Sequence, residues 1–217
     1  TSQWKNLPEP GHFSAEINNG AVKIEATFLY ADLAGSGKIA SVCPWQTTAK
    51  IIRAYLKCSV RLIRAYGGEV RSFDGDRVMG VFKGNTMRSD ATDCAREIDW
   101  VTEKPLQVKA KERIKSVREN YVRIRQACGV DCGTSRAVRA GIRNNNDLIW
   151  IGKSPSFSAK LSDLREYPYS TFISKRVYNR LRQSSREVDG EDIWEQAKFS
   201  FAGKTETIYR TKRMKRP

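Results

Sequence analysis

Two aspartates with glycine close by are the residues of this sequence best suited to chemistry. Asp32 ends an alternating apolar stretch and precedes the small-residue loop Leu33–Gly37, where backbone N–H groups can approach an anion closely. Asp76 lies in an Asp-Gly-Asp turn between two short apolar stretches, which is the signal of a β-hairpin. If the strands that carry them are neighbours in one sheet, both carboxylates reach a single point.

Two carboxylates at one point require a cation between them. Without one, their repulsion forces a proton onto one of the pair. Hard ions such as Mg²⁺ or Mn²⁺ favour oxygen ligands, and two such ions can activate a hydroxyl group and stabilise a departing pyrophosphate. Spacing and periodicity alone favour the simpler alternative, in which Asp32 caps a strand and Asp76 forms a turn.

The elements that must position these aspartates follow from periodicity. Alternation over residues 21–32 predicts a strand. An apolar stripe that includes Ile51, Tyr55 and Ile63 predicts a helix over 47–66. A hairpin after the first helix indicates an α+β sandwich of the ferredoxin-like kind. We further expect strands over 69–73, 77–82, 121–128, 137–142, 148–151, 199–201 and 207–209, and helices over 91–101, 104–119, 156–164 and 174–182.

The composition suits one domain with a core. Of 217 residues, 40% are hydrophobic, and we expect an extension over 1–20, a catalytic domain over 21–210 and a mobile basic tail over 211–217. The absence of a bilayer-length apolar run and of a signal segment predicts a cytoplasmic protein. Five cysteines, an odd number, argue against a disulfide framework, and one histidine, His12, gives the Cys128-x3-Cys132 pair few zinc co-ligands. The net charge of +15 attracts polyanions.

Two segments resemble the metal motifs of the class III adenylate and guanylate cyclases. Tyr30–Ser36 is similar to the first motif, aspartate–aliphatic–x–glycine, and Gly75–Phe82 to the second, glycine–aspartate–x–x–methionine–x–x–phenylalanine. The order and separation of the two motifs also match. The resemblance covers about residues 21–210 and implies the ferredoxin-like cyclase fold and a head-to-tail homodimer with active sites at the interface.

The resemblance also implies a role for several residues. Asp32 and Asp76 would hold two Mg²⁺ or Mn²⁺ ions, with the Leu33 carbonyl as a further ligand. Phosphate contacts would come from the loop Ala34-Gly35-Ser36 and from Lys204. The positions of the family's catalytic asparagine and arginine hold Ser156 and Lys160, so one hydroxyl and one point charge would replace an amide and a guanidinium.

The family's purine pocket is not conserved in residue type here. The purine-selecting lysine position holds Ser72, its usual partner position holds Ile149, and an apolar position holds Asp74. The run Arg71–Met79 resembles the pyrimidine cyclases of bacterial anti-phage defence, whose cyclic UMP or cyclic CMP activates a separate effector protein. We predict UTP as the substrate, with CTP and a purine nucleotide as alternatives. Asp74 suits the cytosine amine, whereas Arg71 or Tyr55 from the partner suits uracil.

Two alternatives of other classes remain. A basic ferredoxin-like sheet also describes many RNA-binding modules, but these need exposed aromatic residues on the central strands. Phe28 and Tyr30 share a phase with apolar residues, which favours the core. We therefore expect no stable nucleic-acid partner and no membrane attachment. The second alternative is a catalytically silent cyclase fold.

Overall fold

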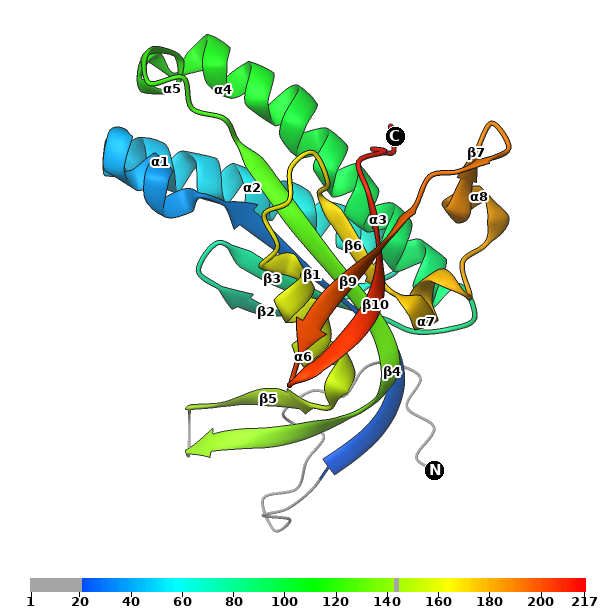
Figure 1. Cartoon of the computed structure of the whole chain (residues 1–217). Coiled ribbons are helices and arrows are strands. Elements are labelled where there is room, and N and C mark those ends of the chain that lie inside the picture. Colours follow the sequence, from blue (N-terminus) through cyan, green and yellow to red (C-terminus); the bar gives the residue numbers. More distant parts are fainter. Residues whose placement is uncertain (1–20, 143–144) are drawn as a thin grey trace.

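A single twisted sheet of eight strands organises the chain in the computed structural model, which describes residues 21–142 and 145–217 (Figure 1). The strand order is β2-β3-β1-β4-β6-β10-β9, and β5 pairs with the outer half of β4. All pairs are antiparallel except β4 with β6. The strands are β1 Ala21–Ala34, β2 Glu69–Asp74, β3 Arg77–Phe82, β4 Arg125–Ile142, β5 Asn145–Ile151, β6 Thr171–Ser174, β9 Glu195–Phe201 and β10 Lys204–Thr211, and a separate small hairpin joins β7 Glu187–Val188 to β8 Glu191–Asp192.

Helices cover both faces of the sheet (Figure 1). The largest core lies between one face and helices α2 and α3, and a second core packs α6 against the other face. None of the described helices is long and apolar enough to cross a bilayer. The helices are α1 Ser36–Val42, α2 Trp45–Ala65, α3 Met87–Val101, α4 Gln107–Arg113, α5 Lys115–Glu119, α6 Lys153–Ser162, α7 Lys175–Tyr178 and α8 Gln183–Arg186.

The predicted α+β class is confirmed, but several elements differ from the expectation. The two strands expected over 121–128 and 137–142 form one continuous strand, β4. The helix expected over 104–119 begins within a π-helical segment, Thr102–Leu106, where Pro105 lacks the N–H that a regular helical ladder needs. It is then divided into α4 and α5 at Ile114, whose backbone is extended. The helix expected over 174–182 is divided between β6, α7 and a turn, and α1 was not predicted. The extension over 1–20, including His12, lies outside the described residues.

Gly129 explains why β4 is continuous across a glycine-rich stretch. It pairs with Tyr30 in the β1–β4 ladder, and α6 crosses directly over it. A Cβ atom at this position would lie 2.1 Å from the Ser158 carbonyl oxygen and 2.6 Å from the Leu161 Cβ. The Ser158 hydroxyl donates to the Phe28 carbonyl oxygen at 3.0 Å, which ties the helix to β1. The glycine therefore marks a close helix–strand contact and fixes the helix that carries Ser156 and Lys160.

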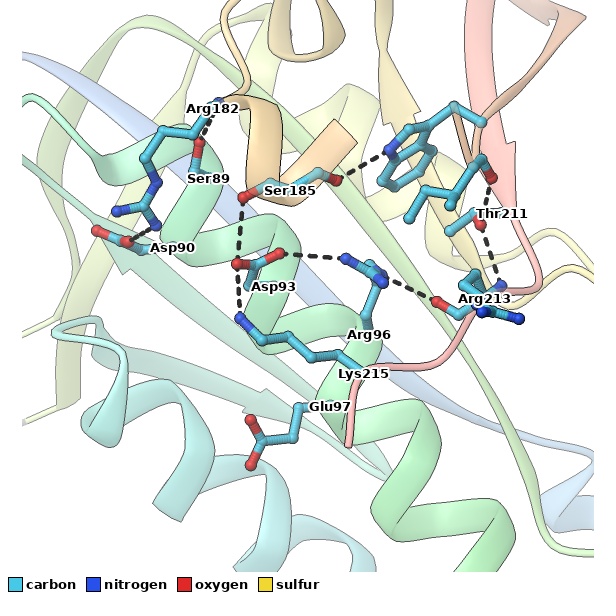
Figure 2. Close-up of polar contacts among 12 residues, drawn as sticks. Ser89, Asp90, Asp93, Arg96, Glu97, Arg182, Ser185, Thr211, Arg213 and Lys215 are labelled. Atoms are coloured by element: carbon cyan, nitrogen blue, oxygen red, sulfur yellow. Dashed lines mark hydrogen bonds and ion pairs between the residues drawn. The ribbon is translucent and has the colours of Figure 1, made fainter. Parts of the chain in front are cut away.

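The C-terminal segment is bound to α3, contrary to the expected mobile tail (Figure 2). The Lys215 ammonium donates to the Asp93 carboxylate at 2.7 Å, and its backbone N–H donates to the Arg96 carbonyl oxygen at 3.2 Å. The Arg96 guanidinium in turn donates to the Arg213 carbonyl oxygen at 2.9 Å. Asp93 and Arg96 are each 3% exposed, so the segment supplies polar partners that buried charges require. Sequence reasoning missed this because the basic run has no apolar pattern.

We expect Gly129→Ala to destabilise the protein by about 2 kcal/mol or more, because α6 must move off the sheet to admit a methyl group. Urea denaturation followed by circular dichroism measures the change. Gly37→Ala is the matched control, since nothing lies within 4 Å of its Cβ position and alanine favours the helix that contains it. Equal stability of the two variants would contradict the close contact.

We expect Lys215→Met to lower the free energy of unfolding by about 1–2 kcal/mol. The substitution keeps the alkyl stem but leaves the Asp93 carboxylate with fewer partners, and the partial exposure of Lys215 limits the loss. Arg216→Met, at the exposed neighbouring position, is the control and should change the thermal midpoint little. If both variants melt alike, the segment contributes nothing through its ion pair.

Candidate active site

Asp32 and Asp76 come together where β1 meets the β2–β3 hairpin. Asp32 lies opposite Arg77 in the β1–β3 register, and Asp76 directly precedes Arg77 in the turn. Burial raises the pKa of the Asp32 carboxyl above its ordinary value, and the nearby Asp76 charge raises it further. The neighbouring Arg165 acts in the opposite direction, by hydrogen bond and by charge. The structure therefore brings the two predicted metal ligands into electrostatic contact.

A guanidinium group already neutralises part of this carboxylate pair. The Arg165 Nη2 donates to the Asp32 Oδ2 at 2.5 Å, and the Asp32 side chain is only 13% exposed. The preference of this point for positive charge, together with hard oxygen donors, fits a divalent cation. Among the described residues, no group of three or more His, Cys, Asp or Glu side chains forms a complete metal site. A bound ion would therefore need further ligands, such as the Leu33 carbonyl and phosphate oxygens.

The predicted phosphate loop joins β1 to α1. Gly35 has a positive φ of 74°, which glycine adopts without strain, and it precedes the first turn of α1. Ala34 and Gly35 also line a cavity of about 570 Å³. Its other walls come from α1, the start of β4 and the segment that follows α6. Lys38, Glu103, Arg123, Arg125, Arg165 and Glu166 are the charged residues that line it.

The predicted catalytic cations lie on the surface of α6 and of the β9–β10 hairpin. Lys160 is exposed and pairs with Asp163 at 3.3 Å, which also binds Arg77 at 3.0 Å. Ser156 is exposed one turn earlier, and its hydroxyl donates to the Gly152 carbonyl oxygen at 3.4 Å. No described contact joins Ser156 or Lys160 to Asp32 or Asp76, so their roles stay predictions.

Lys204 begins β10 and is exposed. The nearby cation Lys153 is engaged with Glu206 at 2.5 Å. The phosphate-binding role of Lys204 stays a prediction.

The predicted base-binding residues do not lie close together within a single copy of the chain. Ser72 is on β2, where its hydroxyl contacts the Met79 sulfur at 3.6 Å, and Asp74 pairs with Arg77 at 2.8 Å. Ile149 is on β5, a different hairpin, and is 46% exposed. These positions can share a base only if a second chain contributes one of them.

The prediction for Tyr55 is wrong in this structure. Its side chain is 0% exposed in the core between α2 and the sheet, so it cannot reach the base bound by a partner chain. Burial raises the pKa of its hydroxyl well above the ordinary value, and the charges of Asp32 and Asp76 raise it further. Tyr55 therefore lies beneath its own chain's carboxylate pair.

Comparison with known proteins gives a consistent assignment. No protein-family profile matches the chain. A uridylate cyclase from Rhodovulum sp. (strain MB263) is 42% identical over 97% of this chain and 88% of its own length. Uridylate cyclases from Burkholderia cepacia and Xanthomonas perforans are 35% and 32% identical, over 89% and 97% of this chain and 84% and 88% of their own lengths.

Solved structures agree on the fold. The guanylyl cyclase Cya2 superposes with a TM-score of 0.70 at 14% identity, over 88% of this chain and 93% of that chain. A bacterial light-regulated adenylyl cyclase gives 0.69 at 17% identity, over 92% of this chain and 55% of that chain. The fold is therefore that of the class III nucleotidyl cyclases. Because its identity to curated relatives exceeds 30% over most of the chain, the chain belongs to the uridylate cyclase family.

A buried carboxyl group that sequence reasoning missed lies behind the cavity. Asp99, 3% exposed, accepts hydrogen bonds from the Ser170 hydroxyl at 2.6 Å and from the Gln126 amide at 3.3 Å. Ser170 and Gln126 both line the cavity. Burial raises the pKa of Asp99 to about 6, although the two hydrogen bonds oppose the shift. The position falls within a predicted helix and has no motif that marks it as buried.

We expect this group to make stability depend on pH. Between the unfolded pKa and about 6, the folded state binds a proton that the unfolded state does not, so the free energy of unfolding falls as pH rises. From pH 4.5 to 7 the decrease attributable to Asp99 is about 2 kcal/mol. Urea titrations at both pH values should show it in the wild type and not in Asp99→Asn, which keeps the shape of the side chain and one acceptor oxygen but does not titrate. A stability difference between the two proteins that is constant with pH would contradict the assignment.

Proposed function

We propose that this chain converts UTP into 3′,5′-cyclic UMP and pyrophosphate. The observation that carries the proposal is the convergence of Asp32 and Asp76 beside a cavity that the phosphate loop lines. The names of the curated relatives, all uridylate cyclases, support UTP as the substrate. CTP remains the alternative, because Asp74 lies at the hairpin tip and could accept from a cytosine amine.

The reaction forms one bond and breaks another at the same phosphorus. The ribose 3′-oxygen attacks the α-phosphorus in line, the bond to the bridging α,β-oxygen breaks, and pyrophosphate leaves. Divalent cations held by Asp32, Asp76 and the Leu33 carbonyl would acidify the 3′-hydroxyl and neutralise phosphate charge. Asp32, water or a phosphate oxygen accepts the hydroxyl proton. The buried side of β1 excludes bulk water beneath Asp32, which strengthens these electrostatic contacts.

A homodimer would complete the site. Ser156, Lys160 and Lys204 are exposed and make no contact with the carboxylate pair of their own chain among the described contacts, as expected if they act on the partner's substrate. Lys160 would offset charge that develops on the α-phosphate, Ser156 would donate one hydrogen bond, and Lys204 would bind the terminal phosphates. Solved structures with this fold include one described as a non-canonical dimeric guanylyl cyclase domain.

The resemblance to the defence cyclases supports a further part of the proposal. Cyclic UMP made in the bacterial cytoplasm would serve as a second messenger that activates a separate effector protein during phage infection. The nucleic-acid-binding alternative is less well supported, because Phe28 is 0% exposed and packs edge-on against Trp150 rather than facing solvent. A catalytically silent fold remains the alternative that experiment must separate.

We expect the purified protein with Mn²⁺ to form cyclic UMP from UTP, and Asp32→Ala or Asp76→Ala to reduce the rate by at least about 100-fold. Loss of a residue that only hydrogen-bonds to a metal ligand typically costs about 10- to 100-fold, and loss of the ligand itself should cost more. Mass spectrometry of products from ATP, GTP, CTP and UTP measures both substrate choice and rate. Glu112→Ala, at an exposed position on α4, is the control.

Each other outcome has a definite meaning. Cyclic CMP as the main product would overturn the choice of UTP as the substrate but would leave the assignment as a nucleotide cyclase intact. Nucleotide binding without any cyclic product would identify a silent fold, and oligonucleotide binding with a steep salt dependence would favour the nucleic-acid module. Near wild-type turnover by either aspartate variant would refute the metal-site assignment.

A further inference from the structure

Arg165 makes two kinds of contact at the edge of the carboxylate pair. Its Nη1 donates to the Ser162 and Leu164 carbonyl oxygens at 2.7 and 3.0 Å, at the C-terminal end of α6. Its Nη2 donates to the Asp32 carboxylate at 2.5 Å. The backbone contacts anchor only the Nη1 side of the guanidinium, so Nη2 can exchange Asp32 for another acceptor while the anchor is kept.

Divalent cations on Asp32 would force that exchange. A divalent cation held by Asp32 would repel the guanidinium that contacts the same carboxylate, because like charges at close range interact unfavourably near a protein surface. The carboxylate oxygen that Nη2 contacts would also be needed as a ligand. Arg165 therefore requires a different anionic partner whenever the pair is occupied.

The cavity of about 570 Å³ that Arg165 lines is suited to supply this partner. Four basic and two acidic side chains line it, and one of the acids, Glu166, is already bound by Arg210 at 2.6 Å. Ala34 and Gly35 of the phosphate loop form part of its wall. The charge and the position beside that loop favour a phosphate group with several negative charges.

Arg125 presents a second guanidinium to the same space. It is the first residue of β4 and pairs with Ala34 in the β1–β4 register. Its guanidinium carbon lies 3.7 Å from the centre of the Tyr167 ring, which fixes the plane of the group. Its Nε is buried and has no hydrogen-bond partner among the described residues. A buried donor without an acceptor is unfavourable, so an anion in the cavity would satisfy it.

We propose that Arg165 and Arg125 bind the β- and γ-phosphates of the substrate from within the same chain, and that Arg165 moves from Asp32 to these phosphates as divalent cations bind. This inference rests on the proposed function. The α-phosphate of the substrate would lie at the carboxylate pair, and its β- and γ-phosphates would lie in the cavity. Lys204 would then reach the terminal phosphates from the partner's side. The two arginines would also hold pyrophosphate after the bond breaks.

The test uses Mn²⁺ and pyrophosphate, which bind without any turnover. In Arg165→Ala we expect Mn²⁺ alone to bind several-fold more tightly, because a competing cation on Asp32 is gone, and pyrophosphate with Mn²⁺ to bind about 10- to 100-fold more weakly. In Arg125→Ala we expect the same weakening for pyrophosphate and unchanged Mn²⁺ binding, since no described contact joins Arg125 to Asp32. Electron paramagnetic resonance of free Mn²⁺ and isothermal titration calorimetry measure the two affinities.

The control and the contrary outcomes keep this test separate from the cyclase assay. Arg113→Ala removes an equal charge at an exposed position on α4 outside the cavity and should change neither affinity. Unchanged pyrophosphate binding in Arg165→Ala, or a loss of Mn²⁺ and pyrophosphate binding together, would overturn the inference even if cyclic UMP forms normally. If the opposite shifts are observed but no cyclic product forms, the proposed function fails and the phosphate site stands.

Discussion

The repulsion between two carboxylates held at one sheet edge is the constraint on which the rest of the site depends. Strand pairing holds Asp32 and Asp76 near each other, because β1 and β3 form an antiparallel ladder of six residue pairs. Burial beneath Asp32 prevents water from screening the two charges fully. The surrounding chain therefore has to supply positive charge, and Arg77 and Arg165 are the groups that do so.

This constraint explains the arrangement of α6. The helix is held against the sheet by small residues: Gly129 beneath it and the Ser158 hydroxyl bonded to β1. The close contact brings the end of α6 to the carboxylate pair, where Arg165 caps the helix and contacts Asp32. The same helix presents Lys160 outward. The C-terminal end of α6 thus contacts the carboxylate pair of its own chain, and the exposed face of the same helix is available to a second chain.

Sequence reasoning predicted the parts of the site that depend on local pattern. Alternation and the Asp-Gly turn were enough to place Asp32 at a strand end and Asp76 in a hairpin, and the register of two antiparallel neighbours did the rest. Arg165 could not be selected, because 39 basic residues are present and its role arises from a contact with a residue 133 positions away. Gly129 and Gly133 lie between the two strands expected over 121–128 and 137–142, which form the single strand β4. A glycine that admits a helix and one that breaks a strand look alike in sequence. Tyr55 shows the opposite error: its place in the apolar stripe of α2 already indicates burial, which excludes the contact with uracil that was expected of it.

The positive charge of the chain acquires a clearer meaning from the structure. Much of it is paired within the chain, as in the contacts of Arg77 with Asp74 and Asp163 and of Lys215 with Asp93. The cavity beside the phosphate loop is different, because its basic side chains outnumber its acids and one buried donor there has no partner among the described residues. A surplus of charge on an open surface attracts any polyanion, whereas a surplus inside a cavity selects a small one. The second case suits a nucleoside triphosphate better than a nucleic acid, which could not enter with its backbone intact.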